Sequence, residues 1–192
     1  MREPEAKYIY AYWPEFDSVC HTHGAGSAQA AAHFAELDSG FAALMKSLAG
    51  TDTLLLVCAD HGLIDTTPAH TVELASHPRL AETLTLPLCG EPRVAYCYVR
   101  PARVEQFKDY VTQELSNYCW MMPAEQAIAE NMFGTGTAHP SLYDRIGDYV
   151  LLMKENYVIN DLLRSEKPFS QIGVHGGLTA DELYVPLVVA RV

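Results

Sequence analysis

Three short stretches of the sequence place aspartate and histidine close together, each directly after an apolar segment. "DSVCH" carries Asp17 and His21, "CADHG" carries Asp60 and His61, and "GVHGG" carries His175. Carboxylate oxygen and imidazole nitrogen are ligands that suit a borderline cation such as zinc, and a site of three such ligands leaves a coordination position for substrate. The five residues therefore predict a metal site, provided that the fold brings the three stretches together.

Each of these residues also has an ordinary structural role. An aspartate after a strand commonly caps a helix or forms an Asx turn, and a single histidine can be a half-buried, hydrogen-bonded side chain. The metal interpretation rests on the coincidence of all five at predicted strand ends. The role of His23 is left undecided: it could form a hydrogen bond to a metal ligand, or it could be a surface residue. The other histidines, in a predicted helix or in loops, are not assigned to the site: His33, His70, His77 and His139.

The predicted elements would gather these residues at one edge of a sheet. Residues 8 to 13 form a short apolar run, which predicts a strand buried on both faces, and "TLLLVC" (53 to 58) predicts a second. Between them, apolar residues recur at steps of three and four from 27 to 48, which predicts a helix. Such a strand, helix, strand unit puts both strand C-terminal ends on the same edge, and Asp17 and Asp60 follow those ends.

The middle of the chain predicts a small α+β unit inserted into this core. "RVAYCYV" (93 to 99) and "CWMM" (119 to 122) are expected to be strands, with a helix over 102 to 116. The apolar segments 148 to 153 and 185 to 192 are then expected to return to the core sheet. The predicted fold class is α/β, with a mostly parallel sheet flanked by helices. The predicted division is 1–89 for the first part of the core, 90–147 for the insertion and 148–192 for the return.

Composition restricts the kind of partner. The chain has 24 acidic and 13 basic residues and a formal net charge of -11, which argues against a surface for nucleic-acid polymers. An anionic substrate would need a local source of positive charge, such as a metal ion. No stretch is long and apolar enough to span a membrane. The five cysteines are odd in number and show no CxxC pair, so a reducing cytoplasm is the expected location.

The stretches "YWPEFDSVCHTHG", "LLLVCADHGL" and "GVHGGLTADELYVPLVVA" together resemble the type I phosphodiesterase and nucleotide pyrophosphatase branch of the alkaline phosphatase superfamily. The resemblance implies an alkaline-phosphatase-like α/β fold with two divalent metal ions, expected to be zinc. It implies that one ion is bound by Asp17, His21 and His175, and the other by Asp60 and His61. It also implies a small phosphate-ester or nucleotide substrate, whose phosphodiester or pyrophosphate bond is hydrolysed.

The sequence departs from that family's pattern in one respect. Family members carry a further Asp and a Thr or Ser nucleophile upstream of the Asp-x-x-x-His segment, and residues 1 to 16 contain neither Thr nor Ser. Ser18 and Thr22 lie at positions that the family does not use for attack, so no catalytic nucleophile is assigned in this chain. We therefore expect the C-terminal, metal-binding half of such an enzyme, inactive alone, with an uncovered apolar face through which it self-associates.

Two other functions are compatible with the same residues. A phosphomonoesterase or phosphosugar mutase of the same superfamily would share the Asp-His-Gly and late-histidine signals. A non-enzymatic α/β domain could use the metal for structure or serve as a binding partner. The coding sequence upstream of Met1 would discriminate among these functions, because only an enzyme needs a strand that ends in Asp and is followed by Thr or Ser.

Overall fold

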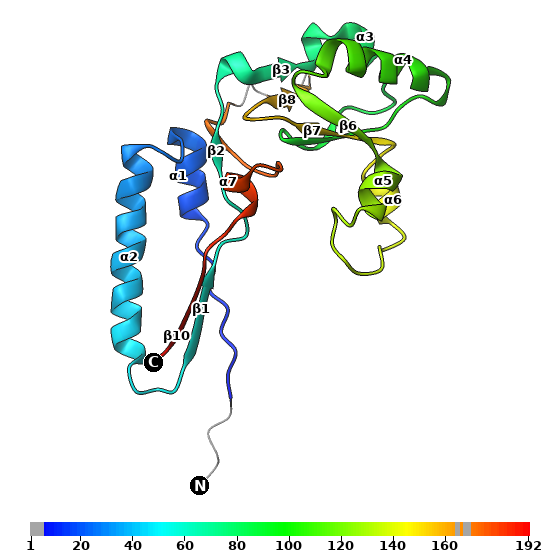
Figure 1. The fold of residues 1–192 in the computed structure, drawn as a ribbon. Coiled ribbons are helices and arrows are strands. Elements are labelled where there is room, and N and C mark those ends of the chain that lie inside the picture. The colour runs from blue at the N-terminus through cyan, green and yellow to red at the C-terminus, as the bar shows by residue number, and fades with distance from the viewer. Residues whose placement is uncertain (1–5, 164–165, 167–169) are drawn as a thin grey trace.

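The computed structural model describes residues 6–163, 166 and 170–192 (Figure 1). One part of the molecule contains two helices and a two-stranded ribbon, and the other contains a four-stranded sheet with short helices. Short strands and the helix α7 (Ala180–Leu183) lie between them. Within the described ranges, no helix combines the length and apolar character that crossing a bilayer would require.

The N-terminal segment forms a helical hairpin. Helix α1 spans Glu15–His23 and α2 spans Ala28–Leu48, which confirms the helix predicted over 27 to 48. The Ser27 hydroxyl caps α2 by accepting a hydrogen bond from the Ala30 amide at 3.0 Å. The two helices pack against each other, with the rings of Phe16 and Phe34 5.9 Å apart.

The strand predicted over residues 8 to 13 is wrong. This segment has no strand conformation, and Tyr8 and Ile9 are 91% and 83% exposed. A strand exists only by pairing with a neighbour, and no backbone hydrogen bond of the described structure joins residues 8 to 13 to another segment. An apolar run in the sequence does not show whether a partner strand is present, and this is why the prediction failed. Asp17 therefore follows no strand and lies on α1 instead.

The strands predicted over 53 to 58 and 185 to 192 are confirmed as β1 (Leu54–Cys58) and β10 (Leu187–Arg191). They pair with each other antiparallel, with Leu56 opposite Val189. The pair β2 (Ile64–Asp65) and β9 (Gly173–Val174) is also antiparallel, whereas β3 (Thr71–Glu73) and β8 (Val158–Asn160) are parallel.

The protein is thus a mixed α/β structure that includes a parallel pair, but the expected predominance of parallel pairing is not found among the described strands. The physical reason is that each of these three pairs joins segments that are distant in the chain. Local apolar patterns do not specify the direction in which such segments return.

The middle of the chain forms a four-stranded antiparallel sheet in the order β4 (Cys89–Glu91), β5 (Val94–Cys97), β7 (Tyr149–Met153), β6 (Cys119–Pro123). The strands predicted near 93 to 99 and 119 to 122 are confirmed. Segment 148 to 153, which was expected to return to the core sheet, lies instead between β5 and β6. The reason is again long-range pairing, because the apolar run of β7 is equally compatible with either sheet. The boundaries at 89 and 147 stay predictions.

Short helices accompany this sheet. The helix predicted over 102 to 116 is confirmed as α4 (Val104–Tyr110), which continues as a π-helical turn over Val111–Leu115. The remaining short elements are α3 (Pro78–Ala81), α5 (Ala124–Ala129) and α6 (Leu142–Arg145), and the 3₁₀ turns Pro68–His70, Leu74–Ser76 and Pro101–Arg103.

Strand β7 is the centre of the main core. Leu151 and Met153 point to the cluster that contains Phe107 of α4, whereas Val150 and Leu152 point to the cluster around α5. Successive side chains of a strand alternate between faces, so β7 is covered on both sides of the sheet.

A buried ion pair connects this sheet to the C-terminal segment. Arg93, in the turn between β4 and β5, binds Glu182 of α7, and the side chains are 0% and 1% exposed. Burial alone would raise the pKa of Glu182, but hydrogen bonds from Arg93, Thr179 and Gly177 offset it and leave the pKa below its ordinary value of 4.5.

Glu182 should make stability sensitive to acid. A carboxyl whose folded pKa is depressed stabilises the fold above its unfolded pKa, and this contribution is lost as pH falls through the folded pKa. We expect the free energy of unfolding, measured by urea denaturation, to decrease below about pH 4.5. In Glu182→Gln it should be lower by about 3–5 kcal/mol at pH 7, because one partner of a buried pair is lost. It should also decrease less on acidification. An identical pH dependence in both proteins would contradict this role.

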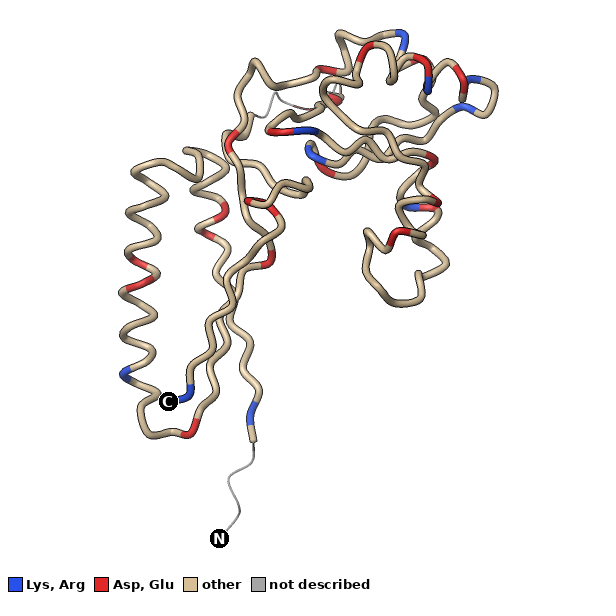
Figure 2. Tube along the Cα trace, in the orientation of Figure 1, with Lys and Arg blue, Asp and Glu red and all other residues tan. Residues whose placement is uncertain are grey.

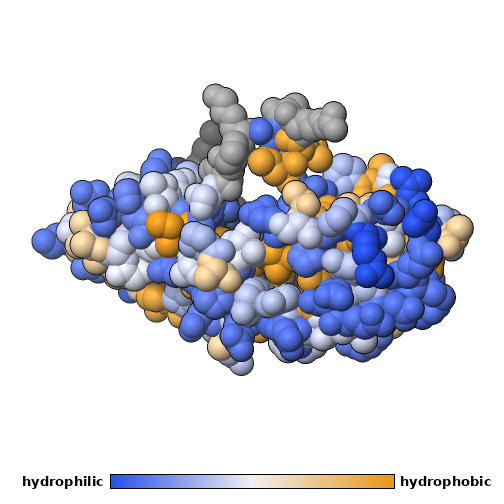
Figure 3. Space-filling view, turned by 90° about the horizontal axis from the view of Figure 1, so that it is seen from above, coloured by the Kyte–Doolittle hydropathy of each residue, from blue (hydrophilic) through white to orange (hydrophobic). Residues whose placement is uncertain are grey.

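The ribbon of β1 and β10 leaves apolar side chains exposed. Leu54, Leu56, Leu187 and Val189 are 64%, 59%, 70% and 57% exposed. Among the described strands each of the two pairs only with the other, so each retains an unpaired edge. Figure 3, seen from above, shows that apolar residues also gather toward the middle of an otherwise mostly hydrophilic face. Exposed apolar strands with free edges favour association with another chain.

We expect the chain to self-associate through the β1–β10 ribbon, with a second copy as the occupant. Leu56→Lys combined with Val189→Lys should shift the chain toward monomer in sedimentation at high concentration, because the two residues are opposite each other. Tyr143→Lys, which changes an exposed aromatic residue of α6, is the matched control and should leave association unchanged. Monomeric sedimentation of the unmodified chain would contradict the expectation.

Candidate metal centre

Helix α1 places Asp17 and His21 on one face. The two residues are four apart, which is close to one helical turn, so their side chains lie one above the other. Oδ2 of Asp17 is 3.1 Å from Nε2 of His21. The Asp-x-x-x-His spacing thus brings the pair together on a helix, whereas Asp17 was expected to follow the end of a strand.

The second ring nitrogen of His21 defines its chemical state. Nδ1 of His21 lies 2.7 Å from the Gly173 carbonyl oxygen. A carbonyl only accepts hydrogen bonds, so Nδ1 carries a proton, and in the neutral form of the ring Nε2 would present a lone pair to Asp17. Two acceptors 3.1 Å apart need a proton or a cation between them. A ligating histidine usually has this arrangement, with its outer N–H bound to a carbonyl or carboxylate.

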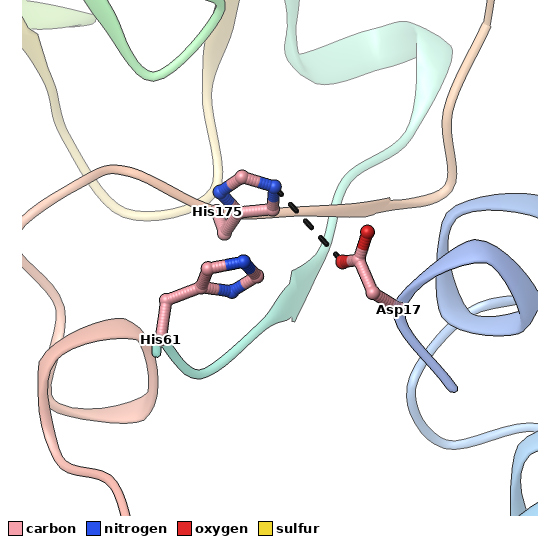
Figure 4. Close-up of side chains that lie close together, drawn as sticks. All are labelled: Asp17, His61 and His175. Carbon is pink, nitrogen blue, oxygen red and sulfur yellow. Dashed lines mark ion pairs between the residues drawn. The ribbon is translucent and has the colours of Figure 1, made fainter. Parts of the chain in front are cut away.

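Strand β9 brings His175 to the same place. Besides the His21 ring contact, the Ile172 amide donates to the His21 carbonyl at 2.8 Å, so the start of β9 lies against α1. Two residues after Gly173, Nε2 of His175 lies 4.0 Å from Oδ1 of Asp17 (Figure 4). His175 and Asp17, which are far apart in sequence, therefore face each other.

His61 completes the group from the loop after β1. Its ring stacks on that of His175, with centroids 3.7 Å apart and planes at 17° (Figure 4). Nδ1 of His61 lies 3.0 Å from the Gly62 carbonyl, so Nε2 is available as a ligand atom. Asp60, next in the chain, is 63% exposed at its side chain and places Oδ1 3.7 Å from Nε2 of His61.

The structure therefore gathers Asp17, His61 and His175, whose ligand atoms all lie within 4.8 Å of one another. Oδ1 of Asp17 is buried and has no hydrogen-bond partner among the described residues. A buried carboxylate oxygen without a partner is costly, and a cation would satisfy it. Within the described part of the chain, this donor set fits a divalent metal ion.

The distances between ligand atoms do not separate the predicted ligands into one group for each of the two expected metal ions. The gathered set takes Asp17 and His175 from one predicted site and His61 from the other. His21 contacts Asp17, and Asp60 contacts His61. The assignment of all five as ligands stays a prediction. His23 is exposed at the end of α1, and none of the described hydrogen bonds or ion pairs involves it.

The electrostatics of the group favour a neutral His175 ring and a bound cation. Burial lowers the pKa of His175, and the neighbouring His61 lowers it further. The neutral imidazole is the form that binds metal. Residues 15–24 and 60–65 contain acidic side chains and no Lys or Arg, and Figure 2 shows most basic residues on the part that holds the four-stranded sheet.

Two hydroxyl residues, Ser18 and Thr22, lie close to the ligands in sequence. The Thr22 hydroxyl donates to the Ser18 carbonyl of its own helix at 2.9 Å, and both residues are exposed. The exclusion of Ser18 and Thr22 as nucleophiles stays a prediction.

Sequence reasoning missed the residues that hold the group together. Gly173 is one of them, because a Cβ there would lie 2.5 Å from the Cys20 carbonyl and β9 could not approach α1. Arg93 and Glu182 are two others. The only local signal was Thr179-x-x-Glu182, a capping-box pattern, which α7 confirms.

Comparison with protein families identifies the family of this chain. The family model described as type I phosphodiesterase / nucleotide pyrophosphatase matches residues 1–178. The chain belongs to this family. Comparison with curated protein sequences gives no significant match.

Solved structures of this family and its relatives share the fold. An inactive form of murine ectonucleotide pyrophosphatase/phosphodiesterase 5 in complex with AMP is 19% identical, with a TM-score of 0.73, over 93% of this chain and 45% of that one. The human enzyme of the same name is 17% identical, with a TM-score of 0.68, over 90% and 44%. Phosphonoacetate hydrolase from Sinorhizobium meliloti 1021 with phosphonoformate is 22% identical, with a TM-score of 0.62, over 90% and 43%. The chain spans less than half the length of these proteins.

Removal of the central carboxylate tests the metal centre. We expect Asp17→Asn to weaken zinc binding by more than the roughly 10- to 100-fold typical of losing an outer partner, since Asp17 contacts His21 and faces His175. Isothermal titration with zinc measures the effect. Asp52→Asn, which removes an exposed carboxylate paired with Arg191, is the control and should leave zinc affinity unchanged. Equal affinities for all three proteins would exclude Asp17 as a ligand.

Proposed function

We propose that this chain forms the metal-binding half of a zinc-dependent phosphodiesterase or nucleotide pyrophosphatase that hydrolyses phosphodiester or pyrophosphate bonds. The observation that carries the proposal is the group of Asp17, His61 and His175 around a buried, unpartnered carboxylate oxygen. When bound, the metal ions would supply positive charge to phosphate oxygens and lower the pKa of an attacking hydroxyl or water.

The ligands are proposed to hold two ions with unequal strength. Asp17, His21 and His175 would hold one ion, and their side chains are partly buried. Asp60 and His61 offer only two ligands for the other, and Asp60 is largely exposed. Catalytic zinc usually has three protein ligands, so the second ion would be bound weakly.

The charge distribution supports metal ions as the phosphate-binding groups. The chain carries a net charge of -11, and the segments that contribute Asp17 and His61 have no Lys or Arg. A phosphate would be repelled by this acidic surface unless bound cations reversed the local charge. For the same reason the proposed partner is a small phosphate ester or nucleotide. The five cysteines are all free, in keeping with the proposed cytoplasmic location.

The proposal includes low activity of these 192 residues by themselves. The Thr22 hydroxyl is hydrogen-bonded to the Ser18 carbonyl of its own helix, and phosphoryl transfer depends strongly on a positioned nucleophile. The solved relatives are more than twice as long as this chain, which supports a requirement for further residues.

Two kinds of substrate have support from the relatives. The murine structure was solved with AMP, which supports a nucleotide substrate, and phosphonoacetate hydrolase supports a phosphonate as the second candidate. Either candidate would place a phosphorus group at the proposed metal ions, and the two differ in the group attached to phosphorus.

A direct assay tests the proposed activity. With saturating zinc, the 192-residue chain should hydrolyse a nitrophenyl phosphodiester far more slowly than a form extended by the upstream coding sequence. A nitrophenyl phosphomonoester and phosphonoacetate, assayed in parallel, distinguish the diesterase from a monoesterase and a phosphonate hydrolase. Robust turnover by the 192-residue chain that is abolished by Ser18→Ala or Thr22→Ala would overturn the assignment of no nucleophile.

A further inference from the structure

Every N–H group of the Arg93 guanidinium in the Arg93–Glu182 pair donates a hydrogen bond. Nε and Nη2 of Arg93 donate to the two carboxylate oxygens of Glu182 at 2.8 and 2.9 Å. The remaining guanidinium protons go to the carbonyls of Lys154, Glu155 and Tyr157. All five donors of the guanidinium therefore have an acceptor, which holds the two side chains in one arrangement.

Glu182 in turn bonds both histidine-bearing loops. Its carboxylate accepts a hydrogen bond from the Gly177 amide at 2.8 Å, two residues after His175. Its backbone carbonyl accepts one from the Gly62 amide at 2.8 Å, directly after His61. One residue thus connects the two loops whose imidazole rings stack 3.7 Å apart.

The glycines in these loops permit the close approach. A Cβ on Gly62 would lie 1.8 Å from the Asp181 carbonyl, and one on Gly177 would lie within 2.6–2.7 Å of the Glu182 carboxylate and the Arg93 guanidinium. Any side chain at either position would push a loop away from α7. The two Gly-containing motifs and the buried pair therefore form one packed unit.

We propose that Arg93 and Glu182 are positioning residues of the metal centre, which set the separation of His61 and His175 through Gly62 and Gly177. This inference rests on the proposed metal-binding function. Arg93 comes from the four-stranded sheet, so the sheet is mechanically coupled to the ligands through a pair that touches neither imidazole.

The experiment compares three variants of the 192-residue chain. Glu182→Ala removes both acceptors for Gly177 and Arg93, Glu182→Gln retains one side-chain oxygen, and Phe107→Leu destabilises the core beneath α4 without contacting either loop. Zinc affinity is measured by competition with a chromophoric chelator. In the metal-free proteins, amide hydrogen exchange is measured at Gly62 and Gly177, and ring-to-ring NOEs between His61 and His175. Circular dichroism identifies any variant that fails to fold.

We expect zinc affinity to fall about 10- to 100-fold in Glu182→Ala, which is the range for losing an outer-shell partner, and less in Glu182→Gln. Faster exchange at both glycines and weaker ring NOEs should follow the same order. Phe107→Leu should leave these readouts unchanged, even where its unfolding transition is lowered as much as that of Glu182→Gln.

The readouts separate the two proposals. If the unmodified chain binds zinc and the Glu182→Gln protein binds it equally well, with unaltered exchange and NOEs, the positioning role is overturned and the metal centre stands. If the unmodified chain binds no zinc, the metal function fails, and the metal-free exchange and NOE data still test whether Glu182 positions the rings. If Phe107→Leu changed zinc affinity, exchange and NOEs as much as the Glu182 variants do, the Arg93–Glu182 pair would act only through overall stability. That result would overturn the inference.

Discussion

The placement of strand β9 between α1 and β2 is the constraint on which the metal centre depends. Its two residues, Gly173 and Val174, are buried and pair with Asp65 and Ile64 on one side. On the other side, the Gly173 carbonyl and the Ile172 amide bond to His21. Each of these contacts requires the backbones to approach closely, and the missing side chain of Gly173 allows it. Because His175 directly follows this strand, the position of β9 restricts the position of His175.

The chemistry of the ligand group follows from which hydrogen bonds are already used. The outer nitrogens of His21 and His61 are occupied by backbone carbonyls, so their Nε2 atoms have only acceptor character in the neutral rings. Asp17 adds carboxylate oxygens to the same space, one of them unpartnered. Such a collection of acceptors is unfavourable by itself. Bound cations would make it favourable, which couples metal binding to the stability of this part of the fold.

The two parts of the molecule differ in how fully they are covered. Leu151 of β7 is fully buried, with helices packed over both faces of its sheet, whereas Leu187 of β10 is 70% exposed. The ribbon nevertheless leads directly to the centre, because β1 precedes His61 and α7 precedes β10. The exposed ribbon thus adjoins the closely packed residues of the ligand group. The Arg93–Glu182 pair provides a second attachment, from the well-packed sheet.

The sequence by itself determined the helix over 27 to 48, the strands at 53 to 58 and 185 to 192, and the family, and it predicted which side chains could bind metal. These follow from residue type, from periodicity over a few residues and from short motifs, which are local properties. Only the tertiary structure decided that Asp17 lies on a helix, that His61 and His175 stack, and that β7 joins β5 and β6. It also decided that Glu182 bonds both histidine loops. These features depend on contacts between residues far apart in the chain, such as His21 and Gly173, which are 152 positions apart. Their geometry is set by strand pairing and close backbone approach, which leave no periodic signal in the amino-acid order.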